Sequence, residues 1–92
     1  MSRTIYLDAR RLKERGEAHN YLAKMLSLPS YYGKNLDALY DCITEMNDCS
    51  IRLLHLEEAG LDGTYGDRIV KVLEEGAEQN PGLEVEKNYS VS

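Results

Sequence analysis

The feature that most constrains the fold is an alternation of short apolar segments with longer stretches of helical spacing. Three segments are predicted to be strands: residues 4–7, 50–56 and 83–90. Apolar residues recur at helical intervals in three others: residues 17–27, 36–46 and 67–78. Strands separated by helices pair in parallel through right-handed crossovers, so the sequence predicts an α/β fold. The mostly apolar second strand is expected at the centre of the sheet, and residues 57–66 are expected to form a loop with one helical turn.

Size and charge narrow the classes of function. The 92 residues are expected to form one domain over residues 1–92, and the net charge of −5 argues against a nucleic-acid partner, which needs Lys and Arg. No apolar run approaches the roughly 20 residues that a membrane span requires, so no membrane partner is expected. The N-terminal residues MSRTIYLDAR lack the apolar core of a signal peptide, which predicts a cytoplasmic protein.

The two cysteines, Cys42 and Cys49, are too few for a disulfide framework. Together with His19 and His55 they match no zinc-binding spacing, so the sequence predicts neither a metal site nor a cofactor. Because cysteine is among the most frequently buried residue types, Cys42 is expected to pack in the core. Cys49 is expected to be a reduced thiol in a loop.

An uncompensated row of acids marks the predicted second helix, for which Asn35 is the expected N-cap. Asp37, Asp41 and Glu45 follow one another at intervals of four residues, and no Lys or Arg occurs between Lys34 and Arg52. Each like-charge pair at this spacing destabilises a helix by about 0.2–0.5 kcal/mol. The helix dipole favours an anion only near the helix start, at Asp37. A helix whose charges are unfavourable for its own stability, without a nearby compensating charge, usually carries a functional site. We therefore predict a binding site for a cationic partner.

Placed at about 100° per residue, the second helix has an apolar face and an acidic face. The apolar face, expected to meet the core, contains Leu36, Leu39, Cys42, Ile43 and Met46. The opposite arc contains Asp37, Asp41, Thr44 and Glu45, with Tyr40 at its border. A solvated polar surface is the ordinary interpretation of a charged arc. Such surfaces usually mix both signs of charge, however, and this one does not.

The tyrosines divide into two expected groups. The chain has seven Tyr and no Phe or Trp, so some tyrosines must serve as core aromatics, and Tyr6, Tyr21 and Tyr89 are assigned to the core. Tyr31 and Tyr40 lie near the acids in sequence and are assigned to an interface. Tyrosine is favoured at interfaces because its ring is apolar and its hydroxyl forms hydrogen bonds. Tyr32 fits either an interface or the core.

The loop and the second helix together resemble the barstar family of intracellular inhibitors of secreted, guanyl-specific bacterial ribonucleases. The resemblance rests on a dense block: Leu28-Pro29, Tyr31-Tyr32-Gly33, Asn35-Leu36-Asp37-Ala38-Leu39, Asp41-Cys42 and Thr44. It is strong for about a fifth of the chain and weaker, but present, over the rest. It implies a small three-stranded parallel sheet flanked by helices, in agreement with the α/β pattern.

The resemblance also implies how the site residues act. Members of the family push the second helix and its preceding loop into the ribonuclease active site. Asp41 matches the residue that replaces the substrate phosphate, Asp37 a second interfacial carboxylate, and Tyr31 the tyrosine against the catalytic histidine. The remaining matched positions are Gly33, Asn35 and Thr44 at the interface and Glu75 as a peripheral acidic contact.

Three positions depart from the best-known member of the family. Tyr40 stands where that protein has a tryptophan, and Glu45-Met46 stand where it has a glycine and a tryptophan. Glu45 adds bulk and charge at the edge of the binding surface, which bears on the choice of target.

The leading hypothesis is therefore a monomeric inhibitor of a basic, secreted-type ribonuclease. An enzyme that uses Asp37 and Asp41 as acid and base is disfavoured, because no His or Lys lies near them in sequence and the chain is too short to enclose much of a cleft. A second hypothesis remains open, that of an acidic interaction or immunity module for another basic protein or toxin. Changes at positions such as Glu45 and Met46 can direct the same fold to a different partner.

Overall fold

A computed structural model describes residues 3–87 and contains the predicted three-stranded parallel sheet. Its strands are β1 (Arg3–Asp8), β2 (Cys49–Leu54) and β3 (Leu83–Lys87), with β2 in the centre. Ile5, Ile51 and Val85 are paired across the sheet. The α/β prediction and the central position of the second strand are confirmed. The predicted extension of the third strand beyond residue 87 lies outside the described residues.

The helices follow the predicted order with shifted ends. They are η1 (Ala9–Arg11), α1 (Arg15–Met25), α2 (Leu36–Thr44), α3 (Leu56–Ala59) and α4 (Tyr65–Gln79). Helix α1 begins two residues before its predicted start because the Glu14 carboxylate caps it, accepting hydrogen bonds from the backbone of Gly16 and Glu17. The single helical turn expected within residues 57–66 is α3, whose first residue is Leu56.

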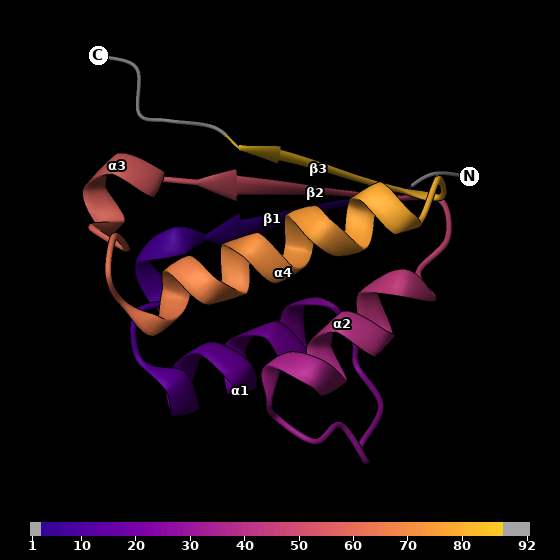
Figure 1. Cartoon of the computed structure of the whole chain (residues 1–92), viewed down its shortest axis with the longest axis horizontal. Helices are drawn as coiled ribbons and strands as arrows, with labels where there is room; N and C mark the ends of the chain where they lie inside the picture. Colours follow the sequence, from indigo (N-terminus) through magenta and orange to yellow (C-terminus); the bar gives the residue numbers. More distant parts are fainter. Residues whose placement is uncertain (1–2, 88–92) are drawn as a thin grey trace.

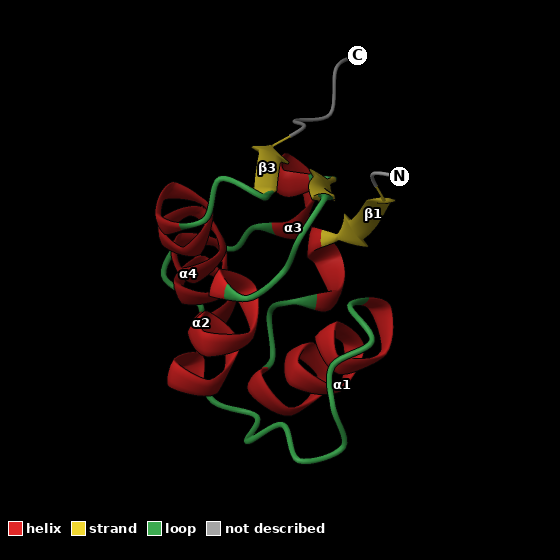
Figure 2. Cartoon of the chain, turned by 90° about the vertical axis from the view of Figure 1, so that its right-hand side faces the viewer, coloured by secondary structure: helices red, strands yellow, loops and turns green. Residues whose placement is uncertain are grey.

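The helices cover one face of the sheet (Figures 1 and 2). In β1, Ile5 and Leu7 point to the helices and are buried, whereas Tyr6 between them points outward. Helix α4 lies next to the sheet, α2 lies beyond α4, and α1 lies on the β1 side of the same face (Figures 1 and 2). The residues of the core with no exposed surface include Leu7, Leu22, Leu39, Ile51 and Leu73.

Two predictions about burial are wrong. Tyr6 is not a core aromatic: it is 55% exposed, because alternation along β1 places it on the uncovered face. Cys49 is not a loop thiol: it is the first residue of β2, is only 3% exposed and shares the inward face with Ile51 and Leu53. Tyr21 is half-buried against the core, and Tyr89 lies outside the described residues.

The position of α2 is fixed by close packing against α4. Gly76 of α4 lies so close to Ile43 that a methyl group built on it would be 2.3 Å from Ile43 Cγ2. Beyond the end of α4, the buried Asn80 side chain donates hydrogen bonds to the carbonyl oxygens of Ile43 (3.0 Å) and Met46 (2.6 Å). Helix α4 thus holds the side of α2, and Asn80, the residue after α4, holds its C-terminal end.

Candidate functional site

The start of α2 is set by Asn35, as predicted. Its side-chain oxygen accepts a hydrogen bond of 2.7 Å from the Ala38 backbone, and its amide nitrogen donates to the Gly33 carbonyl at 3.3 Å. Lys34, immediately before it, has a left-handed backbone with φ of 54°. This conformation costs a non-glycine residue energy and is often found at functional sites, where the surrounding structure enforces it.

The predicted faces of α2 are present. Leu39 and Ile43 are fully buried, and Leu36, Cys42 and Met46 are half-buried against the core. The carboxylates of Asp37, Asp41 and Glu45 are exposed on the other side. Tyr40 and Thr44 are half-buried, and the Thr44 hydroxyl donates to the Asp41 carbonyl at 3.0 Å. A local structural role therefore accounts for the Thr44 side chain in the free protein.

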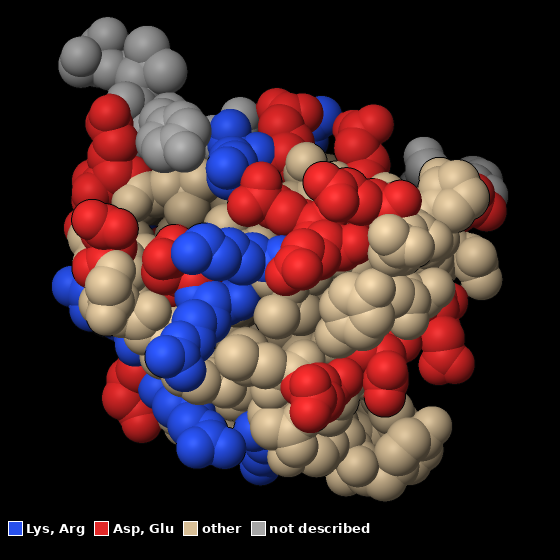
Figure 3. Space-filling model, viewed as in Figure 1, with Lys and Arg blue, Asp and Glu red and all other residues tan. Residues whose placement is uncertain are grey.

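The acids of α2 have no ion-pair partner within residues 3–87. Elsewhere, acids such as Asp8, Glu17 and Glu86 each pair with an arginine. Figure 3 shows Asp and Glu side chains along α2 and over the C-terminal half of α4, whereas Lys and Arg gather where α1 and α4 begin. The three carboxylates that lack a nearby Lys or Arg in the sequence therefore also lack an ion-pair partner among the described residues of the folded structure.

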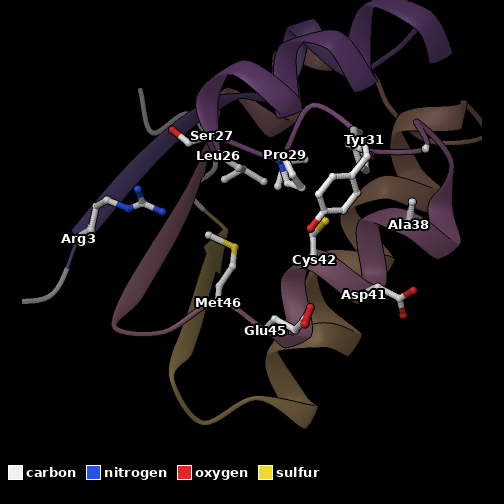
Figure 4. Close-up of a pocket in the computed structure, with 13 residues that line it drawn as sticks. Arg3, Leu26, Ser27, Pro29, Tyr31, Ala38, Asp41, Cys42, Glu45 and Met46 are labelled. Atoms are coloured by element: carbon white, nitrogen blue, oxygen red, sulfur yellow. The ribbon is translucent and has the colours of Figure 1, made fainter.

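A groove of about 500 Å³ lies between α2 and the loop that precedes it. Its lining comprises Arg3, Leu26, Ser27, Leu28, Pro29, Tyr31, Tyr32, Gly33, Ala38, Asp41, Cys42, Glu45 and Met46. Figure 4 shows the Tyr31 ring above Cys42, with Met46 between Cys42 and Arg3. Tyr31 is 86% exposed, an unusual exposure for so large an aromatic side chain.

The structure divides the predicted site residues between two places. Tyr31, Gly33, Asp41 and Glu45 meet in the groove. The others do not line it: Asn35 caps α2, Asp37, Tyr40 and Thr44 lie elsewhere on α2, and Glu75 is exposed on the neighbouring α4. Burial raises the pKa of the Cys42 thiol in the groove, and the Glu45 and Asp41 carboxylates raise it further. That effect indicates that the negative field of both carboxylates extends into the groove.

Sequence reasoning missed Arg3, the first residue of β1, which lies at the end of the groove away from Asp41 (Figure 4). The parallel pairing of Arg3 with Cys49 brings the start of β1 beside the segment that follows α2, where the Arg3 backbone donates to the Asp48 carbonyl at 2.8 Å. The signal was available, because parallel strands begin at the same edge of a sheet. A prediction of strand register would have placed this cation near Met46.

Sequence reasoning also missed a buried polar cluster beneath the loop. Tyr32 packs inward, at 8% exposure, and its hydroxyl is 2.6 Å from Nδ1 of His19. Nε2 of the same imidazole is 2.7 Å from the Tyr65 hydroxyl. Of the two roles that fitted Tyr32, the structure therefore favours the core. A lone histidine at a helical position gave no sign of these two partners.

The described residues offer no obvious place for a metal ion. No group of three or more His, Cys, Asp or Glu side chains within residues 3–87 is arranged to hold one. In the same part of the chain, no helix is long and apolar enough to cross a membrane. The chemistry that the site does offer is a set of exposed carboxylates beside an exposed tyrosine and a half-buried apolar floor.

Known proteins are similar to this sequence over most of its length. The family described as Barstar (barnase inhibitor) matches residues 2–89. A Bacillus subtilis (strain 168) protein named "Putative ribonuclease inhibitor YrdF" is 35% identical over 80 residues, which represent 84% of this chain and 88% of that protein. The family match includes all three strands, the acidic α2 and α4.

Proposed function

The chain belongs to the barstar family, and we propose that it inhibits a bacterial guanyl-specific, barnase-like ribonuclease by inserting α2 and the preceding loop into the enzyme's cationic active site. The observation that carries this proposal is the row of exposed carboxylates on α2 without an ion-pair partner within residues 3–87. A ribonuclease must hold phosphate with cationic groups, and carboxylates on a rigid helix can take the place of that negative charge.

The roles of individual residues follow from the family positions that they match. Asp41 occupies the phosphate position among the arginines and histidine of the enzyme, and Asp37 contributes a second carboxylate. Tyr31, whose ring is almost fully exposed, lies against the catalytic histidine. The remaining contacts come from Gly33, Asn35, Tyr40, Thr44 and Glu45, with Glu75 at the periphery.

Electrostatics gives the proposed complex speed as well as affinity. An acidic helix and a basic active site attract one another at long range and accelerate the encounter. The net charge of −5 adds to this attraction for a basic partner. Fast binding suits a cytoplasmic inhibitor that protects a cell's RNA.

We also propose that the protein is a single domain over residues 1–92, that it is monomeric when free, and that it has no enzymatic activity.

A second candidate is an acidic immunity module for another basic protein or toxin. The observation that favours it is local: Glu45 and Met46, two of the three departures from the best-known member, both line the groove, and Arg3 lies at its far end. Residues that alter the shape and charge of a groove next to the binding helix alter the choice of target. The two candidates share the acidic helix and differ in the protein that it meets.

An inhibition assay against a panel of bacterial guanyl-specific ribonucleases tests the proposal. We expect stoichiometric inhibition of at least one member by the wild-type protein. Asp41→Ala should weaken binding more than Asp37→Ala, Glu45→Ala or Glu75→Ala, by about 2–5 kcal/mol or about 30- to 5000-fold, chiefly through faster dissociation. This range is the general cost of truncating one member of a buried charge pair, and the barstar family's own aspartate is the extreme measured case, above the range.

The matched control is Asp62→Ala, which removes an exposed acid from the loop before α4, away from α2. It should bind within a factor of two of wild type. Binding of Asp41→Ala within threefold of wild type would contradict the insertion of α2 into the active site. Absence of inhibition across the panel, with tight capture of a different basic protein, would favour the second candidate.

A further inference from the structure

Within residues 3–87, the loop that precedes α2 has a single side-chain hydrogen bond to the body of the protein. Within the described residues, the other hydrogen bonds of residues 29–34 are local: the Tyr32 backbone donates to Pro29 at 3.0 Å, and the Gly33 carbonyl accepts from Asn35. The exception is the Tyr32 hydroxyl, 2.6 Å from Nδ1 of His19 in α1. This contact joins the loop that carries Tyr31 to the first helix.

His19 extends this connection to a third element. The imidazole is 1% exposed, and its Nε2 lies 2.7 Å from the hydroxyl of Tyr65, the first residue of α4. The three rings also pack, with centroids 5.7 Å apart for His19 and Tyr32 and 5.4 Å apart for His19 and Tyr65. One buried side chain therefore links α1, α4 and the loop, and both of its nitrogen atoms are used.

We propose that His19 is a positioning residue for the loop, acting through the Tyr32 hydroxyl, and that it holds the loop in the binding-competent position only while its imidazole is neutral. The meaning of binding-competent rests on the function proposed above. The connection between His19 and the order of the loop does not rest on it. Because Tyr31 and Gly33 flank Tyr32 in the chain, loss of this anchor displaces two of the proposed contact residues together.

Hydrogen-bond chemistry explains the requirement for a neutral ring. A neutral imidazole has one nitrogen that donates and one that accepts, and each tyrosine hydroxyl can take either role. One tyrosine therefore accepts from the ring and the other donates to it. In the protonated ring both nitrogens donate, so the tyrosine that had donated must rotate its hydroxyl proton away. That proton then needs a new acceptor in a buried place.

The charges around His19 oppose its protonation. Arg15 of α1 lies with its guanidinium carbon 5.8 Å from the centre of the Tyr65 ring, and Lys34 lines the same surface recess as His19. Burial lowers the pKa of His19, and Arg15 and Lys34 lower it further. The acid in the recess, Glu14, is already engaged by the backbone of Gly16 and Glu17 at the start of α1.

The remaining polar groups in contact are the two tyrosine hydroxyls and, in the recess, the uncharged Asn20. Burial raises the pKa of the Tyr32 hydroxyl well above its ordinary value, and the neighbouring Cys42 and Tyr65 raise it further. Tyr32 therefore supplies no anion that would stabilise the imidazolium. Acidification must place an uncompensated positive charge in the cluster before it releases the loop.

The decisive experiment measures backbone ¹⁵N order parameters of residues 30–34 in the free protein by NMR. In wild type at pH 7.5 we expect values near 0.85, typical of rigid backbone. Tyr32→Phe keeps the packed ring and removes the hydroxyl, and should lower the values below about 0.6. The matched control is Tyr21→Phe, which removes a different tyrosine hydroxyl, one that accepts from the Asp8 backbone at 2.8 Å, and should leave the loop rigid.

A pH titration of the unmodified wild-type protein provides the second test. The His19 ring protons and the loop order parameters should change with the same midpoint, while the amides of β2 stay ordered. His19→Gln, which cannot titrate, should show no pH dependence of loop order between pH 7.5 and 5. A loop that stays rigid in Tyr32→Phe, or through the titration of His19, would overturn the proposal. These measurements need no ribonuclease, so a failure of the proposed function leaves their result unaffected.

Discussion

Asn80 offers the sharpest test of how the fold positions the site. Its side chain is 6% exposed and makes three hydrogen bonds, donating to Ile43 (3.0 Å) and Met46 (2.6 Å) and accepting from the Gly82 backbone (2.9 Å). Each such bond contributes about 0.5–1.5 kcal/mol, and buried groups left without partners cost more. We therefore expect Asn80→Ala to lower the free energy of unfolding by about 2–4 kcal/mol.

Urea denaturation measures this loss directly, and a thermal melt should show a decrease in Tm of about 8 °C or more for a domain of this size. The matched control is Gln79→Ala, an exposed change at the adjacent residue, which should stay within about 0.5 kcal/mol of wild type. Asn80→Asp keeps the acceptor for Gly82 but turns a carboxylate toward two carbonyl oxygens, so it should be at least as damaging as alanine. A loss below about 1 kcal/mol in Asn80→Ala would refute the assignment of Asn80 as the anchor of the end of α2.

Four further predictions concern charge and packing. Asp41→Lys should abolish inhibition yet leave the unfolding free energy unchanged or raised by about 0.2–1 kcal/mol, because it removes two like-charge pairs; a clear loss of stability would mean that Asp41 is structural. The association rate with an inhibited ribonuclease should fall steeply between 0.1 and 1 M salt, as the Debye length shrinks from about 10 to about 3 Å, and a flat profile would count against electrostatic steering. The folded-state pKa of His19 is lowered, so the unfolded state binds more protons than the folded state. The contribution of His19 to the free energy of unfolding is therefore complete above about pH 6.5 and declines by up to about 1.4 kcal/mol per pH unit below it. His19→Gln should remove this slope in urea titrations between pH 6.5 and 5. Gly76→Ala should cost about 1–3 kcal/mol, because the added methyl overlaps Ile43; a stabilised variant would show that α2 and α4 are not in close contact.

Local pattern was enough to predict the order and the pairing of the main elements. The helical spacing before Pro29 and the alternation in the first strand both depend on neighbours in the sequence, which periodicity detects. The errors arise where burial depends on distant parts of the chain. Tyr6 is exposed because none of the described helices covers the outer face of the sheet, as Figure 2 shows, and nothing within the strand's own sequence encodes that absence.

The part of the candidate site that lies on one helix was predictable from the sequence. The spacing of Asp37, Asp41 and Glu45 gave their shared exposed side, and Asn35 gave the start of the helix. The groove and the anchors were not predictable in this way, because they join segments far apart in sequence. Tyr32 and Tyr65 meet at His19 across separations of 13 and 46 residues, and no local pattern signals a contact of that kind.

The energies explain how α2 can carry its acids without losing its structure. Two like-charge pairs at i,i+4 cost about 0.4–1 kcal/mol in total. On the other side of the helix, complete burial of Leu39 and Ile43 contributes about 1.5–3 kcal/mol each. The end of the helix, where the dipole would favour a cation, is held by Asn80 instead. Because the anchoring face and the charged face are separate, substitutions of the acids should change the affinity for a partner much more than the stability of the fold.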